Sequence, residues 1–291
     1  MEYLASEFEL HRTHLKAVAY RMLGSVPEAE DAVQEAWLRL DRSDGEGIEN
    51  LGGWLTTVVA RVSLDKLRAR QARREEVFEE GRLPDPVVSR DEALDPEQEA
   101  MLADSVGLAL LVVLETLSPA ERLAFVLHDM FAVPFDDIAP IVDRSPDAAR
   151  QLASRARRRV QGEPAVPDAD LDTQREVLDA FLAAAREGDF EALVEVLDPD
   201  VVLRADRRGV SIGAPGVVRG AANVARGALA FSRLDIEVRP ALVNGAVGTV
   251  TFRDGRPFAI AGFTIRARRI VEMDIIADPE RLNRIDLEVL D

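Results

Sequence analysis

The chain has 291 residues, of which 47% are hydrophobic and 31% charged, so it is long enough for two or three folded domains and is neither disordered nor fibrous. Cysteine is absent, which excludes disulfides and thiolate metal sites, and the most apolar stretch, residues 106–114, is far shorter than a membrane span. The acidic first residues do not form a secretory signal, so we expect a cytoplasmic protein with no membrane contact, metal or cofactor.

The formal net charge of −17 argues at first against a nucleic-acid partner, because phosphate contacts need lysine or arginine. The acidic residues are concentrated, however, and residues 75–104 contain eleven of them against Arg82 and Arg90. Basic clusters lie on both sides of this segment, and such asymmetry is more informative than the total charge. The clusters are Arg61, Lys66, Arg68, Arg70, Arg73 and Arg74 before it, and Arg150, Arg155, Arg157, Arg158 and Arg159 after it.

The first part of the chain is expected to be helical. Ser25 and Glu28 have the spacing of a capping box, and apolar residues recur every three or four positions through residues 29–40. Four glycines within residues 41–53 predict a loop. Residues 54–74 form a long predicted helix that begins apolar and ends strongly basic.

The middle of the chain predicts a linker followed by four helices. Leu83-Pro84-Asp85-Pro86 favours extended backbone within a linker at residues 75–94. The last two helices are joined by a tight turn at residues 143–145 and form a helix-turn-helix unit. From N-cap and proline signals, the predicted helices are residues 95–117, 118–130, 135–142 and 145–160.

The last third of the chain follows a second proline-containing linker at residues 162–172. Helical patterns give way to strand-like runs, which predict a compact α+β domain with a meander of antiparallel strands. The predicted helices are residues 171–187, 190–197 and 221–231, and the predicted strands are residues 201–205, 234–243, 247–253, 257–267 and 270–276.

The helix-turn-helix carries the strongest functional signal. In such a unit the N-terminal part of the second helix enters the major groove, where arginine and glutamine can pair with guanine and adenine. The arginines at 157–159 lie further along and favour phosphate contact. An αα-hairpin whose arginines only complement the helix dipole is the alternative. The candidate DNA-binding residues are Ser145, Asp147, Ala148, Arg150, Gln151, Ser154, Arg155 and Arg158.

Two further helices have patterns that leave alternatives open. The basic end of residues 54–74 predicts phosphate contact, although a basic helix end is also a common solvated face. The polar face of residues 27–40 is acidic and amide-bearing, which suits a protein partner and a solvated surface equally well.

These segments, in this order, resemble extracytoplasmic-function (ECF) sigma factors of the sigma-70 family. Residues 29–40, AEDAVQEAWLRL, resemble the core-polymerase-binding helix of region 2. Residues 53–68 resemble the following segment, which melts promoter DNA and reads its −10 element. Residues 117–122 and 150–159 resemble region 4, which reads the −35 element.

The resemblance implies the partners and their contacts. Core RNA polymerase, through its β′ and β subunits, and promoter DNA are the expected partners. The loop at residues 43–53 is expected to capture an unstacked base. Val62 stands where the family often has asparagine, so −10 reading is expected to differ in detail. The implied contacts are Asp31, Gln34, Glu35 and Leu38 with the β′ clamp helices, and Arg61, Lys66, Arg68 and Arg70 with the −10 backbone.

Residues 188–194 and 198–203 resemble the opening of SnoaL-like domains, which have a cone-shaped α+β fold. A subgroup of ECF sigma factors carries this domain at the C-terminus, where it is thought to modulate activity in place of an anti-sigma protein. Leu83-Pro84-Asp85-Pro86 and Asp278-Pro279-Glu280-Arg281-Leu282 resemble motifs of that subgroup, the second only loosely. The resemblance thus implies regulatory roles for Asp278, Pro279 and Leu282, and it admits an unidentified small ligand.

The expected fold class is multi-domain, with two all-α domains followed by an α+β SnoaL-like cone. The predicted boundaries are 1–75 for sigma region 2, 76–95 for an acidic linker, 96–162 for the region 4 helix-turn-helix, 163–172 for a second linker and 173–291 for the SnoaL-like domain. We further hypothesise that the acidic segment and the last domain hold the two sigma domains in an inactive spacing.

Two other functions remain open from the sequence. A DNA-binding regulator with a ligand-sensing cone predicts tight binding to DNA without polymerase. A SnoaL-like enzyme with a DNA-binding appendage needs an acid or base in the cone, yet no histidine follows residue 160. We therefore expect no enzymatic activity, although an Asp–Arg pair could still act as acid and base. The candidates for such a pair are Asp200, Arg204, Asp206 and Asp274.

Overall fold

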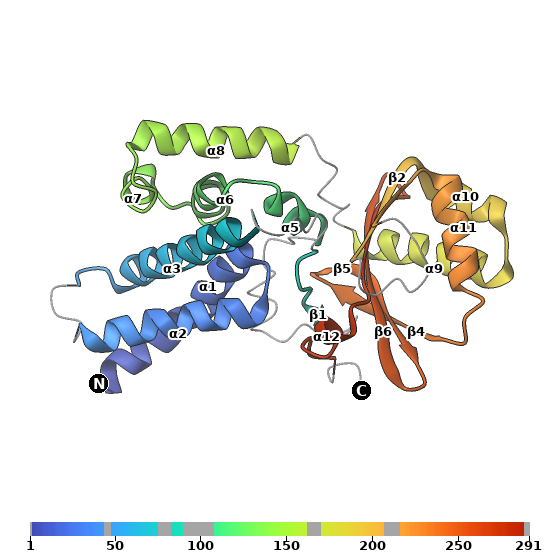
Figure 1. The fold of residues 1–291 in the computed structure, drawn as a ribbon, viewed down its shortest axis with the longest axis horizontal. Coiled ribbons are helices and arrows are strands. Elements are labelled where there is room, and N and C mark those ends of the chain that lie inside the picture. Colours follow the sequence, from blue (N-terminus) through green and yellow to red (C-terminus); the bar gives the residue numbers. More distant parts are fainter. Residues whose placement is uncertain are drawn as a thin grey trace. The chain divides into compact units, whose positions relative to one another are not determined.

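The computed structural model describes residues 2–43, 48–74, 83–89, 108–161, 170–206 and 216–287. They form two compact units, drawn as ribbons in Figure 1. The first unit contains residues 2–43, 48–74 and 113–161, and the second contains residues 83–89, 108–112, 170–206 and 216–287. Within these described ranges, no helix has the length and apolar character that crossing a membrane requires.

Three helices at the start of the first unit pack against one another: α1 (Glu2–Leu23), α2 (Val26–Arg42) and α3 (Leu51–Arg74). They confirm the helices predicted for this part of the chain. Their apolar stripes face inward, as expected for amphipathic helices. Fully buried side chains on these stripes are Leu15, Val18, Ala29, Ala36, Leu55 and Val59.

Two details of this bundle differ from the prediction. The capping box at Ser25 is wrong, because Ser25 makes no side-chain cap and Glu28 instead accepts a hydrogen bond from Arg70. The loop is also shorter than predicted, since α2 continues to Arg42 and α3 already begins at Leu51. Asn50 explains the early start, because its Oδ1 accepts a hydrogen bond from Gly53 N at 3.0 Å in the first turn.

The rest of the first unit consists of α6 (Pro119–Phe125), the π-helix η1 (Val126–Met130), α7 (Phe135–Ile138) and α8 (Pro146–Gln161). The predicted capping box is present at Ser118 and Glu121. The helix predicted for 118–130 thus begins as expected but ends as a π-helix, and α7 stops four residues before the predicted end. Of the helix predicted for 95–117, only α5 (Leu108–Glu115) lies in the described residues.

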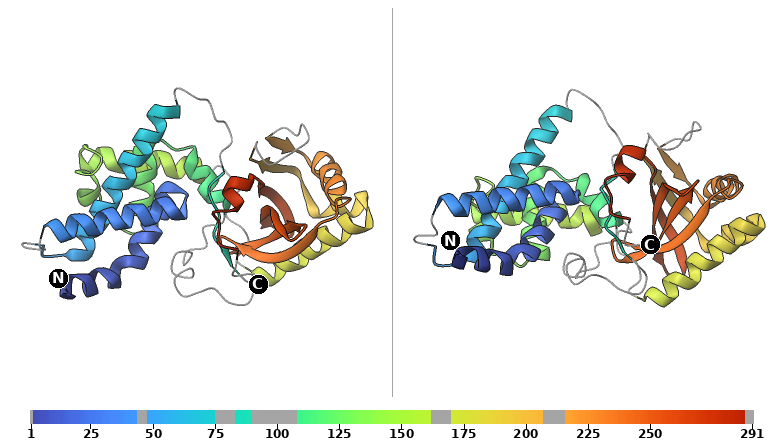
Figure 2. Two further views of the ribbon diagram at one scale, coloured as in Figure 1. Left: turned by 60° about the horizontal axis from the view of Figure 1, so that its bottom comes forward. Right: turned by 90° about the horizontal axis from the view of Figure 1, so that it is seen from below.

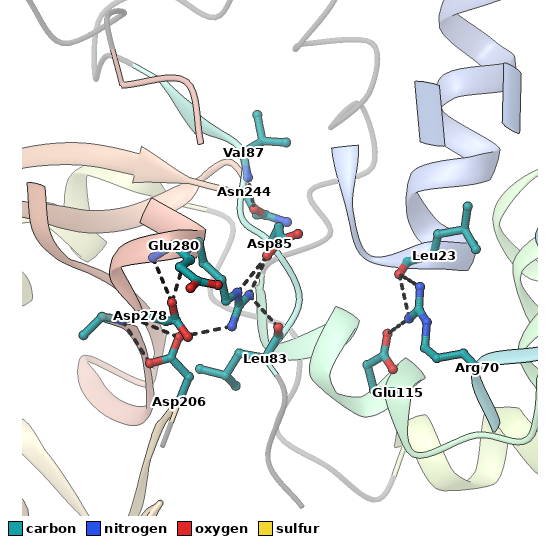
Figure 3. A network of polar contacts seen from close by, with 12 residues as sticks. Leu23, Arg70, Leu83, Asp85, Val87, Glu115, Asp206, Asn244, Asp278 and Glu280 are labelled. Carbon is teal, nitrogen blue, oxygen red and sulfur yellow. Dashed lines mark hydrogen bonds and ion pairs between the residues drawn. The ribbon is translucent and has the colours of Figure 1, made fainter. Parts of the chain in front are cut away.

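Two inward-turned arginines join the first three helices to α6 and to Glu115, at the end of α5. Arg122, with 2% of its side chain exposed, donates two hydrogen bonds of 3.1 Å to the carbonyl oxygen of Arg21 and one of 2.8 Å to Glu115. Arg70 donates to Leu23 O at 3.3 Å and lies 3.8 Å from Glu115 (Figure 3). These bonds satisfy C-terminal carbonyls of α1, which lack partners inside the helix.

The second unit contains a seven-stranded sheet among its described residues. The predicted antiparallel meander is confirmed for β4 to β7. It is wrong for β2, which pairs with β7 in parallel. Local periodicity predicts that a segment is a strand, not which distant strand it pairs with. In sheet order, the strands are β1 (Val88–Ser89), β4 (Glu237–Val243), β5 (Ala246–Arg253), β6 (Arg256–Arg266), β7 (Arg269–Ile276), β2 (Leu197–Ala205) and β3 (Val217–Arg219).

Each face of this sheet supports a separate core. Helices α9 (Leu171–Glu187), α10 (Phe190–Val196) and α11 (Ala221–Phe231) cover one face, as Figure 2 shows in yellow and orange. The other face packs on Leu83, Val88 and Leu108, and on Leu282 of α12 (Pro279–Leu282). Residues of the predicted first linker are therefore part of the hydrophobic core of the second unit.

Candidate nucleic-acid interface and regulatory contacts

The second helix of the helix-turn-helix, α8, has one buried and one exposed face. Ala149, Ala153 and Ala156 are fully buried, and their small side chains allow close packing on α6 and α7. Ser145 Oγ accepts a hydrogen bond from Ala148 N at 3.3 Å in the first turn. The opposite face brings together the exposed side chains of Asp147, Arg150, Gln151, Ser154, Arg155 and Arg158.

Acidic residues of the supporting helices hold the arginines of α8 from one side. Glu121 accepts from Arg155 at 3.1 Å and from Arg159 at 3.3 Å, while Asp129 accepts from Arg157 at 2.7 Å. Burial works to raise the pKa of Glu121, but hydrogen bonds from Ser118 and Arg155 outweigh it and lower that pKa, so the carboxylate stays charged. The guanidinium groups are thus oriented while their outer sides remain in solvent.

The basic side chains of α3 divide into exposed and buried ones. Arg61 and Arg68 are exposed, whereas Lys66 is paired with Asp31 at 3.4 Å. Arg70 is turned inward, with 14% of its side chain exposed among Leu23 O, Glu28 and Glu115. The predicted set therefore does not form one continuous basic surface.

On α2, Asp31, Gln34 and Leu38 are exposed, and Glu35 is half-buried and paired with Arg39 at 3.0 Å. Beside this face, a groove of about 480 Å³ runs between α1 and α2 and includes Gln34 in its lining. The four residues predicted from the sequence therefore lie on one helix face that is open to a partner.

In the second unit, Arg281 binds the predicted linker. Its guanidinium donates to Asp85 at 2.7 and 2.9 Å, to Leu83 O at 2.7 Å and to Asp206 at 3.2 Å (Figure 3). Only 14% of the Arg281 side chain is exposed, so these bonds form away from bulk water.

A second hydrogen-bonded pair lies along the same segment. Val87 N donates to Asn244 Oδ1 at 2.8 Å, and Asn244 N donates to Val87 O at 2.8 Å. Together with the antiparallel pairing of β1 and β4, these bonds make residues 87–89 an added edge of the sheet.

The three residues predicted to be regulatory, Asp278, Pro279 and Leu282, lie around Arg281, to which the prediction gave no role. Asp278 caps α12 by accepting from Glu280 N at 2.9 Å, Pro279 starts the helix, and Leu282 is buried. Sequence reasoning missed Arg281 and Asn244. Arg281 could have been found, because it lies within the motif at residues 278–282, but Asn244 lies outside the motifs described above.

A buried charge cluster links β2 and β7. Arg204 donates to Glu272 at 2.9 Å and to Asp274 at 3.3 Å, and both carboxylates are almost completely buried. Burial raises the pKa of Asp274 to about 7, with Arg204 opposing and Glu272 adding to the shift. Of the four acid/base candidates, only Arg204 and Asp274 meet, whereas Asp206 binds Arg281 and Asp200 is exposed.

Comparison with known proteins decides the family. Residues 8–73 match the family model described as Sigma-70 region 2, and residues 107–160 match Sigma-70, region 4. The ECF RNA polymerase sigma factor SigJ of Mycobacterium tuberculosis is 42% identical over 290 residues, covering 95% of this chain and 92% of that protein. This chain belongs to the ECF RNA polymerase sigma factor family.

Two further similarities extend along almost the whole sigma factor. The probable ECF RNA polymerase sigma factor SigI of Mycobacterium tuberculosis is 34% identical over 288 residues, covering 98% of this chain and 97% of that protein. The crystal structure of the Mycobacterium tuberculosis sigma factor SigJ has a TM-score of 0.78 and 39% identity, and covers 97% of this chain and 99% of that chain.

The regions of the sigma factor follow the predicted order. Region 2 corresponds to α1, α2 and α3, and region 4 to the described helices from α5 to α8. The predicted family and the predicted fold class, two all-α domains followed by an α+β SnoaL-like domain, are confirmed. The domain boundaries and the individual site residues stay predictions.

Proposed function

We propose that this sigma factor guides core RNA polymerase to promoters by holding two DNA elements with two helices. In this proposal α8 reads the −35 element, and the exposed basic side chains of α3 hold the backbone near the −10 element. The separation of buried and exposed residues on α8 carries the proposal, because alanines occupy the buried face and Arg150 and Gln151 lie together on the exposed face. Arginine and glutamine are the side chains best suited to read guanine and adenine in the major groove.

The proposed DNA contacts of α3 follow from which of its basic side chains are exposed. We assign Arg61 and Arg68 to DNA phosphates, and Lys66 to the same role after it leaves Asp31. Arg70 receives a different role, the packing of α1 and α3 against the segment before α6, because its guanidinium already meets three acceptors.

The exposed face of α2 is the proposed contact with core polymerase. Asp31, Gln34, Glu35 and Leu38 are assigned to the clamp helices of β′, and the β subunit is the second expected partner. A face with one apolar side chain among polar ones suits a reversible interface. The Leu38 side chain, at 38% exposed, is the apolar centre of this face.

Reconstitution with purified core polymerase tests the proposal. We expect the full chain to bind core polymerase and to support specific initiation on a pool of genomic promoter fragments, while binding free promoter DNA weakly because of its acidic charge. Leu38→Ala is expected to weaken core binding, and the exposed Leu10→Ala, on α1, serves as the matched control. Tight DNA binding without any affinity for polymerase would instead support a DNA-binding regulator.

We further propose that the C-terminal domain modulates initiation by holding residues 83–89. The supporting observation is that Arg281 and β4 bind the stretch of chain that connects region 2 to region 4. Arg204, Glu272 and Asp274 are assigned a structural role between β2 and β7 rather than a catalytic one.

Loosening the contact between Arg281 and residues 83–89 should raise the level of transcription initiation. We expect Arg281→Ala to speed hydrogen exchange at the amide of Val87 and to increase run-off transcription, because Asp85 and Leu83 O lose their donor. Arg284→Ala, an exposed arginine two residues after α12, is the control and should change neither. Unchanged exchange and transcription in Arg281→Ala would reject a regulatory role for this contact.

A further inference from the structure

Arg150, the first arginine on the exposed face of α8, lies between an acid and an aromatic ring. Its Nη1 donates to Asp147 Oδ1 at 2.6 Å, and its guanidinium carbon lies 5.4 Å from the centre of the Phe135 ring. The side chain remains 61% exposed, so these contacts orient it without covering it. Because Asp147 is itself 86% exposed at the start of the same helix, it can pivot together with Arg150, whereas Phe135 comes from another helix.

Phe135 is itself held in place. The His128 ring stacks on it with a centroid distance of 3.8 Å and an interplanar angle of 29°. His128 Nδ1 is within hydrogen-bonding distance of Val133 O, at 3.0 Å, and Val133 N donates to Leu127 O at 2.9 Å. His128 lies in the π-helix η1, and π-helices occur mostly as single-turn bulges, frequently at functional sites. The two rings thus link the middle of η1 to the start of α7 and present the Phe135 face to Arg150.

We propose that Phe135, backed by His128, is a positioning residue that fixes the direction of the Arg150 guanidinium and thereby sets base preference at one position of the −35 element. This inference rests on the proposed role of α8 in promoter reading. A planar guanidinium reads guanine through two parallel hydrogen bonds, which depend on its orientation. A ring face held by a second ring restricts that orientation through cation–π contact.

A structural role for Phe135 makes a different prediction. If Phe135 only packed α7 against α8, its loss would loosen the whole helix-turn-helix and weaken binding to every promoter sequence alike. A positioning role instead alters discrimination at the one base pair that Arg150 reads, and it disappears once Arg150 has been removed. A structural role therefore predicts an equal loss at every base pair of the −35 element, whereas a positioning role predicts a loss of discrimination at one base pair.

The test uses the full chain with core polymerase on a promoter on which the wild type already initiates, so that its result is separate from that of the reconstitution. Each base pair of the −35 element is changed in turn, and relative initiation is measured for the wild type and for Phe135→Leu. We expect discrimination to fall about two- to fivefold at one position, the range that an exposed cation–π contact corresponds to. Phe135→Tyr should retain the wild-type profile, since a tyrosine ring offers a similar face.

Three further variants keep the test decisive. His128→Asn removes the backing ring but keeps a group able to donate to Val133 O, and it should cause a smaller loss at the same position. Phe131→Leu is the matched control, because Phe131 contacts His14 and Arg21 rather than Arg150, and its profile should not change. In the Arg150→Ala background, Phe135→Leu should cause no further loss. An equal loss at all positions, or an unchanged profile in both Phe135→Leu and His128→Asn, would overturn the proposal.

Discussion

The arginines of α8 and those of the C-terminal domain use the same side chain in opposite ways. Arg150, Arg155 and Arg159 are each about half exposed or more, and each pairs with a single acid, to which Arg150 adds the Phe135 ring. Arg204 and Arg281 are at most one-fifth exposed and lie among carboxylates. A cluster of basic residues in a sequence therefore indicates a DNA-binding face only where the fold leaves the guanidinium groups in solvent.

Arg70 and Arg122 show that the first unit also contains arginines that are turned inward, in addition to the exposed ones of α8. Both come from segments that match sigma-70 regions, yet both guanidinium groups are turned inward and donate to carbonyl oxygens of α1. Their charge stabilises packing and is not available to phosphate. Burial should therefore separate the structural arginines from the DNA-binding ones.

The largest effect is expected on stability. Arg122→Ala should lower the free energy of unfolding of the first unit by about 3–5 kcal/mol, because it leaves Glu115 and the carbonyl oxygen of Arg21 without their buried donor. Arg158→Ala, which removes an exposed side chain, should cost less than about 0.5 kcal/mol. Thermal unfolding of both variants measures the difference, and equal costs would break the distinction between the two kinds of arginine.

The charge cluster of Arg204, Glu272 and Asp274 predicts a pH dependence in the second unit. The pKa of Asp274 is raised in the folded state from 3.8 to about 7, so the folded chain binds a proton more tightly than the unfolded chain. The stability that this proton supplies is fully present below about pH 4 and is lost as the pH rises to about 7. Denaturant titrations between pH 5 and pH 8 should show stability falling with pH.

Asp274→Asn sharpens this prediction. Asparagine resembles the protonated carboxyl group, so the variant should lose much of the slope between pH 5 and pH 8 and gain most relative to the wild type at pH 8. The exposed Asp200→Asn is the matched control and should keep the wild-type slope. An identical slope in wild type and Asp274→Asn would mean that another group causes the dependence.

A smaller effect is expected on the salt dependence of promoter binding. Arg158 has no side-chain hydrogen bond or ion pair within the described residues and faces the same side as Gln151 and Ser154. Loss of one phosphate contact through Arg158→Ala should reduce the slope of log affinity against log salt by about 1 without changing base preference. Binding of the polymerase complex at several salt concentrations measures this slope, and a shifted base preference would assign Arg158 to base reading instead.

The sequence predicted α8 and its exposed residues well because the signals are local. Ser145 and Pro146 mark the start of the helix. Alanines and arginines at helical spacing then define its buried and exposed faces. Arg70 was predicted to contact DNA from its charge alone, although it follows the buried Leu67 by three residues and so continues the buried stripe of α3.

The contacts of the linker could not be predicted in the same way. Strand β1 has two residues, too few for a periodic pattern, and its partner Val243 lies more than 150 residues away in the chain. Asp85 and Arg281 carry opposite charges, but many such pairs exist in a chain with 31% charged residues. Only the folded arrangement identifies which of them meet.

Run-off transcription with core polymerase, comparing the wild type with the double variant Arg150→Ala/Arg155→Ala, tests the central claim most directly. We expect the variant to bind core polymerase through α2 but to lose specific initiation, because the exposed face of α8 has lost two of its arginines. Full initiation by the double variant at the same promoter would contradict the claim that this face reads DNA.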